Sequence, residues 1–286
     1  MRKIYSEGKW LDAHMYSVED LDLGNTIYGP AILTEPTGTI IIEKNWTAQL
    51  NKFRHLILKR KENSVTLTDE TVKYDPVRLE IFNNLFMSIA EQMGLVLQNT
   101  SQSVNVKERL DFSCAIFDAE GNLIANAPHV PVHLGSMDST VKVIINGNLP
   151  INPGDVFVQN NPYNGGSHLP DITVISPVFD DNNEHILFFL ASRAHHEDVG
   201  GIAPGSMSPL GRTIYQEGII LDGLKLVDKG IFQTDKIRAA FSAGQYPARN
   251  IDQNIADLMA QTAANAAGAA ELNKLVKQYG LSLIHI

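Results

Sequence analysis

Six of the nine histidines in this 286-residue chain fall between His129 and His196, and five of these lie in three short segments near glycine or proline residues. Loop-prone positions of this kind often carry functional groups. His168 and Asp171 are three residues apart in a segment rich in glycine and proline, so both side chains can face one point. An imidazole nitrogen and a carboxylate oxygen are ligands that suit Zn²⁺, Mn²⁺ or Fe²⁺. The spacing therefore predicts a divalent-metal site.

A third ligand is expected from the adjacent pair His195 and His196, either of which can fill the position. A His-x-x-Asp pair alone is also typical of a hydrogen-bonded structural pair without metal, and the adjacent histidines favour the metal interpretation. Glu197 and Asp198 follow directly. We expect these two carboxylates to orient the ligands or to act as a general base.

The strands that must position these residues form a hairpin. Residues 172–175 and 186–191 are apolar and read as antiparallel neighbours joined by the polar turn at residues 180–183. In such a pair the start of the first strand lies beside the end of the second. Asp171 and His195 are therefore expected at the same edge of the sheet. The alternative to a shared metal site is that these residues only hydrogen-bond to each other across the strand ends.

Two further segments are candidates for contact with a small molecule. His129 and His133 flank prolines, and we expect one of them to be a core histidine and the other to line a cleft. Residues 160–166, Asn-Asn-Pro-Tyr-Asn-Gly-Gly, can cradle an anion through backbone N–H groups. The chain has no GxxxxGK[ST] loop, so we expect no ATP site of its own. Cys114 lies in an apolar strand pattern and is expected to be an inert buried thiol.

The periodicity predicts a short β-rich segment followed by a larger mixed region. Strands are expected at residues 31–33, 39–42, 46–50 and 56–58, which are too few to close a core of their own. Residues 59–75 are charged and polar and read as a linker. Beyond them we expect a helix from Pro76 that Gly94 interrupts, a hairpin over 111–123, a helix over 135–146, a strand at 155–159 and a long helix over 250–279, broken near Gly268. The expected fold class is α/β (α+β), with mixed or antiparallel sheets and packed helices.

The composition excludes several classes of protein. The chain is 44% hydrophobic and 19% charged, with a formal net charge of −9 and one cysteine. One cysteine excludes a disulfide-stapled module, and the acidic balance without a basic run excludes a nucleic-acid partner. No apolar run approaches the roughly 20 residues of a membrane-spanning helix, and the N-terminus lacks the apolar segment of a signal peptide. We expect a cytoplasmic protein without a membrane partner.

Four motifs occur in the order of the hydantoinase B/oxoprolinase family, which the chain resembles over nearly all of residues 20–280. They are residues 108–118 (ERLDFSCAIFD), 127–137 (APHVPVHLGSM), 161–171 (NPYNGGSHLPD) and 195–201 (HHEDVGG). Residues 29–46 resemble the end of the hydantoinase A/oxoprolinase region. The resemblance implies four segments: residues 1–58 as the C-terminal tail of the A region, 59–75 as a linker, 76–280 as the N-terminal part of the B region, and 281–286 as a non-native tail.

The resemblance also implies an activity. The chain is expected to be a fragment of an ATP-dependent 5-oxoprolinase or hydantoinase, which opens a cyclic amide such as 5-oxo-L-proline to L-glutamate. ATP would be bound by an upstream region, and the partner would be the rest of the oxoprolinase chain or a hydantoinase A-like subunit, in a homo-oligomer when full length. Two alternatives are an acetone-carboxylase-type subunit and an inactive incomplete chain.

The site assignments follow from the motifs that carry the resemblance. The resemblance implies His168, Asp171 and His195 as the metal ligands, with manganese, zinc or iron as the metal. We assign catalytic roles to Glu197, Asp198 and His133. We assign contacts with the substrate to Asn161, Tyr163, Gly165 and Gly166.

Overall fold

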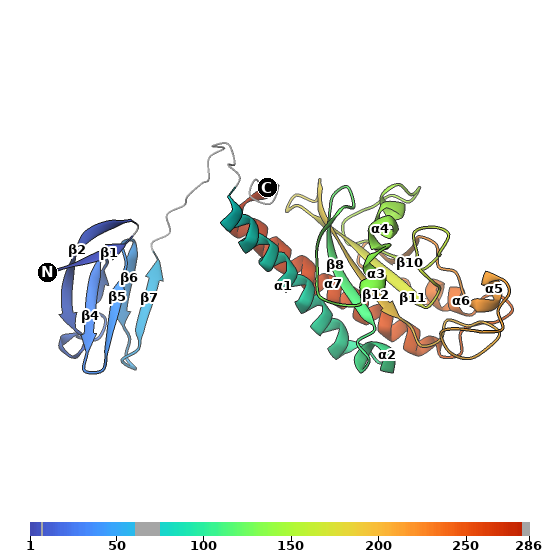
Figure 1. Cartoon of the computed structure of the whole chain (residues 1–286), viewed down its shortest axis with the longest axis horizontal. Coiled ribbons are helices and arrows are strands. Elements are labelled where there is room, and N and C mark those ends of the chain that lie inside the picture. Colours follow the sequence, from blue (N-terminus) through green and yellow to red (C-terminus); the bar gives the residue numbers. More distant parts are fainter. Residues whose placement is uncertain (7, 61–74, 282–286) are drawn as a thin grey trace. The chain divides into compact units, whose positions relative to one another are not determined.

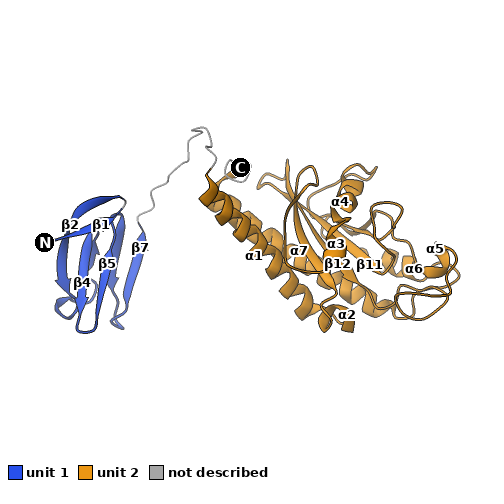
Figure 2. Ribbon diagram, viewed as in Figure 1, with its two compact units in different colours: residues 1–70 blue, residues 71–286 orange. Residues whose placement is uncertain are grey.

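A computed structural model describes residues 1–6, 8–60 and 75–281 of the chain. The chain divides into two compact units, Met1–Glu70 and Thr71–Ile286 (Figures 1 and 2). The expected mixed fold, with antiparallel sheets, packed helices and a preceding β-rich segment, is confirmed.

In residues 1–6 and 8–60, unit 1 consists of strands and their connections, with one short 3-10 turn at Val18–Asp20. The strands are β1 (Arg2–Ser6), β2 (Lys9–Ser17), β3 (Thr26–Tyr28), β4 (Ala31–Glu35), β5 (Gly38–Ile42), β6 (Trp46–Leu50) and β7 (Leu56–Arg60). They form a four-stranded sheet in the order β1-β2-β4-β5 and a three-stranded sheet in the order β3-β6-β7. The expectation of too few strands for a core is wrong, because five residues form a buried cluster: Ile27, Ala31, Leu33, Ile42 and Ala48.

The first three strands escaped the sequence analysis because they show little alternation. In β2 the one buried residue is Ala13, and the rest of the strand is exposed or partly exposed. At the other end of unit 1, Lys59 and Arg60 were expected in the linker but extend β7, where they pair with Thr47 and Trp46. The rest of that linker (residues 61–74) and residues 282–286 of the expected tail lie outside the described residues.

Unit 2 is organised around one seven-stranded antiparallel sheet in the order β14-β13-β10-β11-β12-β8-β9. The strands are β8 (Phe112–Asp118), β9 (Leu123–Asn126), β10 (Val156–Gln159), β11 (Asp171–Phe179), β12 (Ile186–His195), β13 (Leu224–Asp228) and β14 (Ile231–Phe232). The helices are α1 (Pro76–Thr100), α2 (Val104–Lys107), α3 (Pro131–Leu134), α4 (Met137–Ile145), α5 (Ile214–Glu217), α6 (Thr234–Phe241) and α7 (Ile251–Tyr279).

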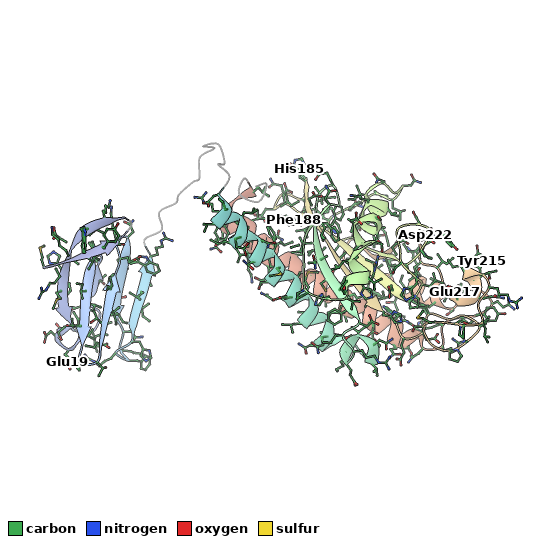
Figure 3. The ribbon with its side chains drawn as sticks, in the orientation of Figure 1. Glu19, His185, Phe188, Tyr215, Glu217 and Asp222 are labelled. Carbon is green, nitrogen blue, oxygen red and sulfur yellow. The ribbon has the colours of Figure 1, made fainter. Side chains whose placement is uncertain are left out.

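The two faces of this sheet are covered by different helices (Figure 1). Helices α1 and α7 lie side by side and pack on one face, where Phe86 of α1 meets Phe188 of β12 at 6.1 Å between ring centroids (Figure 3). Helices α3 and α4 cover the other face, where Met137 and Val141 pack against Phe157 and Phe189. Alternate residues of a strand face opposite sides of the sheet, and helices cover both sides here. Nearly all side chains of β11 and β12 are therefore buried, which explains why their sequences are nearly continuous apolar runs.

Both long helices run unbroken through the glycines that were expected to interrupt them. A Cβ atom at Gly268 would lie 2.5 Å from the Met93 sulfur, and one at Gly94 would lie 2.7 Å from His129 Nε2. The two glycines therefore mark close contacts of the helices with their neighbours. Breaking the helix costs more than tolerating one glycine, which is about 1 kcal/mol less favourable than alanine.

The helices of the described residues 1–6, 8–60 and 75–281 include none that is both long and apolar enough to cross a membrane. Helices α1 and α7 are the longest, at 25 and 29 residues. Their length serves packing against each other and against the sheet.

The hairpin of β11 and β12 is longer than was expected from the sequence, and it brings together the strand ends that were expected to meet. Asp171 pairs directly with His195 across the hairpin. The prediction that these two residues share one sheet edge is therefore confirmed.

Asp155, which precedes β10, is a buried carboxylate that joins three segments. It accepts hydrogen bonds from Lys225 Nζ at 2.7 Å and from the backbone N–H groups of Lys229 and Asn152, both at 2.8 Å. Burial raises the pKa of Asp155, but the bonds from these three residues outweigh burial and hold that pKa below its ordinary value. The ionised form is therefore the one that stabilises unit 2.

We predict that Asp155→Asn lowers the free energy of unfolding by about 1–3 kcal/mol at pH 7, because the ammonium of Lys225 loses its nearer and buried carboxylate partner and keeps the partly exposed Asp228. A depressed folded-state pKa stabilises the fold above the ordinary value of about 3.9, and this contribution disappears as the pH falls through the folded-state value. Urea denaturation at several pH values should therefore show the two proteins converging in acid. A difference that is constant from pH 7 to pH 3 would contradict this assignment.

Candidate metal centre

Three predicted ligands meet at the edge of the sheet where β11 begins and β12 ends. Asp171 Oδ1 lies 2.8 Å from His195 Nδ1, and Asp171 Oδ2 lies 2.9 Å from His168 Nδ1. The two imidazole centroids are 5.0 Å apart. One potential ligand atom from each of the three residues lies within 4.8 Å of the others. The hairpin register places Asp171 and His195, and the turn before β11 places His168.

Asp171 is the most deeply buried member of this cluster, with 1% of its surface exposed. Burial raises the pKa of Asp171, but the surrounding imidazoles of His133, His168 and His195 outweigh burial and hold that pKa far below its ordinary value. Ser167 Oγ also donates a hydrogen bond to Asp171 Oδ2 at 2.8 Å. The carboxylate is therefore ionised, while the half-exposed His168 leaves one side of the cluster open to solvent.

His133, from the short helix α3, is the buried member of the His129 and His133 pair. Its Nε2 atom lies 3.5 Å from Asp111 Oδ1 and 3.6 Å from Asp171 Oδ2, and its Nδ1 atom lies 3.2 Å from Ser113 Oγ. A serine, a histidine and a carboxylate in this order resemble a hydrolase triad. Ser113 is completely buried, however, and so is inaccessible as a nucleophile.

Arg193 is a fully buried cation on the same face of the sheet. Its guanidinium donates to Thr173 Oγ1 (2.8 Å), to the His133 carbonyl oxygen and Ser136 Oγ (both 2.7 Å), and to Thr140 Oγ1 (2.8 Å). Burial lowers the pKa of Arg193 to about 10, and the charge of Asp171 opposes that shift. Arg193 therefore stays charged at neutral pH and partly balances the buried carboxylate.

The donor set fits a divalent cation. Two imidazole nitrogens and one carboxylate oxygen, with one open side, are the ligands of many catalytic zinc, manganese and iron sites. The Nδ1 atoms of His168 and His195 lie 2.9 and 2.8 Å from the two Asp171 oxygens, which is close enough for the three residues to act as ligands of one cation.

The choice between the adjacent histidines is decided by the alternation of β12. His195 faces Asp171, whereas His196 is fully buried on the side of α7. There His196 Nε2 lies 3.1 Å from Gln261 Oε1, and His196 Nδ1 lies 3.1 Å from Asn254 Nδ2. His196 is therefore part of the contact between the sheet and α7.

The contacts of Glu197 and Asp198 differ from those expected of catalytic groups. Asp198 accepts hydrogen bonds from the backbone N–H groups of Gly200 and Gly205 and from the guanidinium of Arg249, at 2.9, 3.3 and 2.7 Å. Its carboxylate therefore organises the following loop. The exposed Glu197 accepts from Gln253 Nε2 at 3.0 Å, and neither residue contacts the Asp171 cluster by a hydrogen bond or ion pair within the described residues.

The predicted substrate-binding segment is a tight loop that leads into the cluster. Tyr163 is 86% exposed at its tip, whereas Asn161 Nδ2 is bonded to Asp222 Oδ2 at 3.0 Å. The Gly165 carbonyl accepts a hydrogen bond from the Thr140 hydroxyl. A Cβ atom at Gly166 would lie 2.7 Å from the carbonyl oxygens of both Asn160 and Asn161, so this glycine is required by the close approach of the backbone.

Four residues of the site were missed by the sequence analysis: Asp111, Ser167, Arg193 and Asp222. Ser167 and Asp111 lie inside the quoted motifs, but serine and aspartate are common loop residues. Arg193 had one usable signal, a charge inside an otherwise apolar strand, because arginine is almost never fully buried without partners.

Comparisons with known proteins agree with the two-unit organisation. Residues 75–285 match the sequence profile of the family described as hydantoinase B/oxoprolinase, and residues 1–61 match that of the hydantoinase/oxoprolinase C-terminal domain. 5-Oxoprolinase 1 of Arabidopsis thaliana is 46% identical over 99% of this chain. The chain spans 23% of the length of that relative.

Two solved structures are similar to part of the chain. The ATP-dependent caprolactamase from Pseudomonas jessenii is 28% identical with a TM-score of 0.64, over 74% of this chain and 36% of that one. An acetone carboxylase has a TM-score of 0.67 at 17% identity, over 73% of this chain and 27% of that one. At that identity, the second likeness shows a shared fold alone.

We predict that Arg193→Met lowers the free energy of unfolding by about 3–5 kcal/mol, because it leaves the buried charge of Asp171 without its compensating cation. Arg238→Met is the matched control, since Arg238 is exposed and pairs with the exposed Asp252. That substitution should change stability by no more than about 1 kcal/mol. Denaturant titrations of both variants measure the difference, and equal small effects would show that Arg193 carries no such role.

Proposed function

The chain belongs to the hydantoinase B/oxoprolinase family, and on that premise we propose that it forms part of an ATP-dependent hydrolase that opens the cyclic amide 5-oxo-L-proline to L-glutamate. The observation that carries this proposal is the 46% identity to a protein named 5-oxoprolinase over 99% of the chain. The caprolactamase likeness supports the reaction class, since that structure is described as ATP-dependent. An acetone-carboxylase-type activity has only the shared fold in its favour.

The chemistry of the substrate explains the need for ATP. An unstrained five-membered lactam resists attack by water, and phosphorylation of its oxygen creates a better leaving group. The printed sequence contains no GxxxxGK[ST] loop, and we propose that ATP is bound elsewhere in a longer protein or by a hydantoinase A-like subunit. This chain would then complete the hydrolysis of the activated amide.

His168, Asp171 and His195 would hold a divalent cation, for which manganese, zinc and iron are the candidates. When bound, the cation would supply Lewis acidity next to the open side of the cluster. Asp171 contributes a permanently ionised carboxylate, and Ser167 and the imidazoles fix its orientation.

Of the three residues with predicted catalytic roles, His133 is the one that lies at the cluster. Its Nε2 atom lies between Asp111 and Asp171, so a proton held there can be shared with either carboxylate. Asp111 is partly exposed and connects this position with solvent. We propose that His133 transfers this proton. We propose that Asp198 has a structural role, in which its carboxylate holds the loop after residue 198 in place.

The substrate contacts are proposed for the loop of residues 161–166. Tyr163 presents its side chain to solvent, so it is available to a ligand. Gly165 keeps the backbone close to α4, and Gly166 keeps it close to the carbonyl oxygens of Asn160 and Asn161. Asn161 acts through the shape of the loop, since its amide is held by Asp222. Assembly as a homo-oligomer in the cytoplasm is part of the same proposal.

We predict that the 286-residue chain by itself hydrolyses neither ATP nor 5-oxoproline, because no ATP-binding loop is present in it. A longer family protein containing this sequence should show ATP hydrolysis that depends on 5-oxoproline, measured as phosphate and glutamate release. If the longer protein forms neither product, the proposed substrate is wrong.

We predict that His168→Ala in the longer protein lowers metal content and activity together, by more than tenfold in affinity, because a ligand is lost. Metal analysis after equilibration with Mn²⁺ or Zn²⁺ gives the first readout, and product release gives the second. Asp180→Asn, in the exposed turn between β11 and β12, is the control and should change neither. Full metal occupancy with lost activity would remove His168 from the ligand set.

A further inference from the structure

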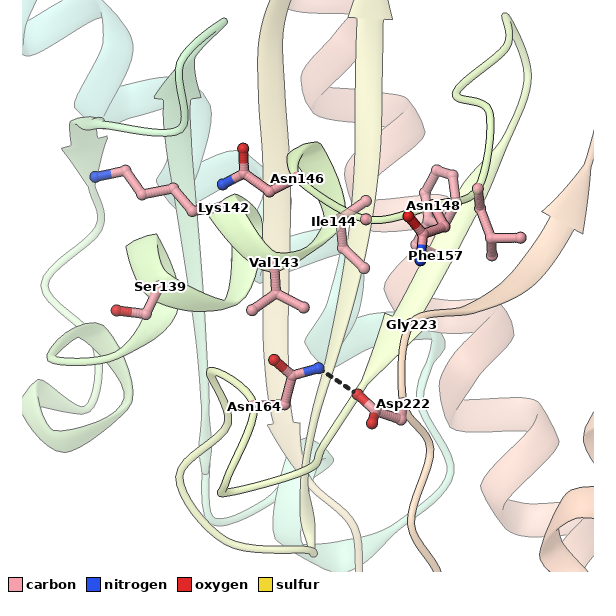
Figure 4. A pocket seen from close by; sticks show the side chains of 12 residues that line it. Ser139, Lys142, Val143, Ile144, Asn146, Asn148, Phe157, Asn164, Asp222 and Gly223 are labelled. Atoms are coloured by element: carbon pink, nitrogen blue, oxygen red, sulfur yellow. Dashed lines mark hydrogen bonds between the residues drawn. The ribbon is translucent and has the colours of Figure 1, made fainter.

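The asparagine-rich segment before His168 is held by one carboxylate on another loop. Asp222 accepts hydrogen bonds from Gln159 Nε2 at 2.9 Å and from Asn161 Nδ2 at 3.0 Å. It also accepts one from Asn164 Nδ2 at 2.8 Å (Figure 4). Gln159 ends β10, whereas Asp222 precedes β13. Two side chains of the segment that was expected to bind a ligand, Asn161 and Asn164, and the preceding Gln159 are therefore committed to this contact.

Backbone contacts reinforce the same junction. The Asn160 N–H donates to the Leu221 carbonyl at 2.9 Å, and the Leu221 N–H donates to Asn160 Oδ1 at 2.6 Å. The Asn160 amide also donates to the carbonyl oxygens of Leu169 and Ile219, at 2.8 and 2.9 Å. Asn160 thus joins the two ends of the loop to each other, and Asp222 holds the part between them.

The carboxylate form of Asp222 is the one that this arrangement requires. Within the described part of the chain, Asp222 has no ion pair with a lysine, arginine or histidine, and its contacts are with neutral amides. Partial burial raises the pKa of Asp222, but the bonds from Gln159, Asn164 and Asn161 outweigh it and leave that pKa below the ordinary value. An ionised carboxylate only accepts hydrogen bonds, so it satisfies all three donors at once.

The far end of the loop leads directly into the Asp171 cluster. The Gly166 N–H donates to the Asn161 carbonyl at 2.8 Å, and the Thr140 hydroxyl binds the Gly165 carbonyl. Ser167 and His168 then both contact Asp171 Oδ2. A shift of Asn161 would therefore reach His168 through the short segment of residues 162–167.

We propose that Asp222 is a positioning residue, which holds residues 161–166 so that Ser167 and His168 are presented to Asp171. The part of this proposal that concerns a cation rests on the proposed function. The part that concerns the loop and the His168–Asp171 contact does not.

Asp222 suits a test because it lies at the surface (Figure 3). With Asn164 it lines an open cleft of about 650 Å³ beside the C-terminal end of α4, where Lys142 and Asn146 form the opposite side (Figure 4). Replacing an exposed side chain leaves the buried clusters of unit 2 intact. The variants are therefore expected to fold, which far-UV circular dichroism and thermal unfolding verify.

The first experiment measures amide hydrogen exchange at Tyr163, Asn164 and Gly166 in this chain. Asp222→Ala removes all three hydrogen bonds, and we expect exchange at least about tenfold faster, equivalent to about 1.4 kcal/mol. Asp222→Asn should give a smaller acceleration, since its amide nitrogen opposes one donor while its oxygen keeps the others. Asp228→Ala is the matched control, because Asp228 is a partly exposed aspartate of the adjacent β13. Among the described residues its carboxylate has a hydrogen bond and ion pair with Lys225 alone. Unchanged exchange in Asp222→Ala would overturn the proposal.

The second experiment follows His168 itself. The imidazole ¹⁵N chemical shifts of His168 report its Nδ1 contact with Asp171 without any metal, and we expect them to move in Asp222→Ala and to stay in Asp228→Ala. Titration with Co²⁺ should show affinity reduced about tenfold in Asp222→Ala, as for other residues that orient ligands. Unchanged His168 shifts would overturn the proposal. Failure of the unsubstituted chain to bind Co²⁺ would instead count against the proposed cation site, and the His168 shifts would still decide the role of Asp222.

Discussion

The site depends on keeping one carboxylate, Asp171, ionised although the residue is buried, with only 1% of its surface exposed. Moving a carboxylate out of water costs several kcal/mol unless hydrogen bonds and charges compensate. His168, His195 and Ser167 supply the hydrogen bonds, and the buried guanidinium of Arg193 supplies a compensating charge. Asp171, which requires these compensating groups, is also the residue that we propose as the oxygen ligand of a cation. The stability of this part of the fold and the chemistry of the site therefore depend on the same carboxylate.

The supports of this carboxylate differ in rigidity. Asp171, Arg193 and His195 lie on paired strands, and Arg193 also joins helices α3 and α4 to the sheet through His133 and Thr140. His168 lies on a loop, which needs a separate anchor because loops are less constrained than strands. The hydrogen bonds to Asp222 give that loop its shape. The asparagines of the motif therefore have a structural role in shaping the site, and this role does not require that they contact the substrate.

Polar residues also organise the opposite face of the sheet. Along α7, Gln261 donates to the carbonyl oxygens of Ile172 and Ser192, at 2.9 and 2.8 Å, and Asn265 donates to the Val174 carbonyl at 3.0 Å. These bonds fix the register of the helix against the β11–β12 hairpin. His196 contributes to the same interface through Gln261. The strands that carry the cluster are thus held by specific contacts on both faces, which limits the movement of Asp171 and His195.

The amino-acid sequence by itself determined the hydrophobic periodicity of the strands and helices and the chemical types of the side chains in the motifs. The apolar runs on both sides of a polar turn predicted the β11–β12 hairpin, and the hairpin alone placed Asp171 opposite His195. Periodicity identifies the face of a strand but not the residue that packs on it. The burial of Arg193, the approach of His133 and the anchoring of Asn161 by Asp222, 61 residues away, were therefore decided by tertiary structure. Tertiary structure also decided which of His195 and His196 lies beside Asp171, because adjacent side chains of a strand face opposite sides and the periodicity does not show which side Asp171 occupies.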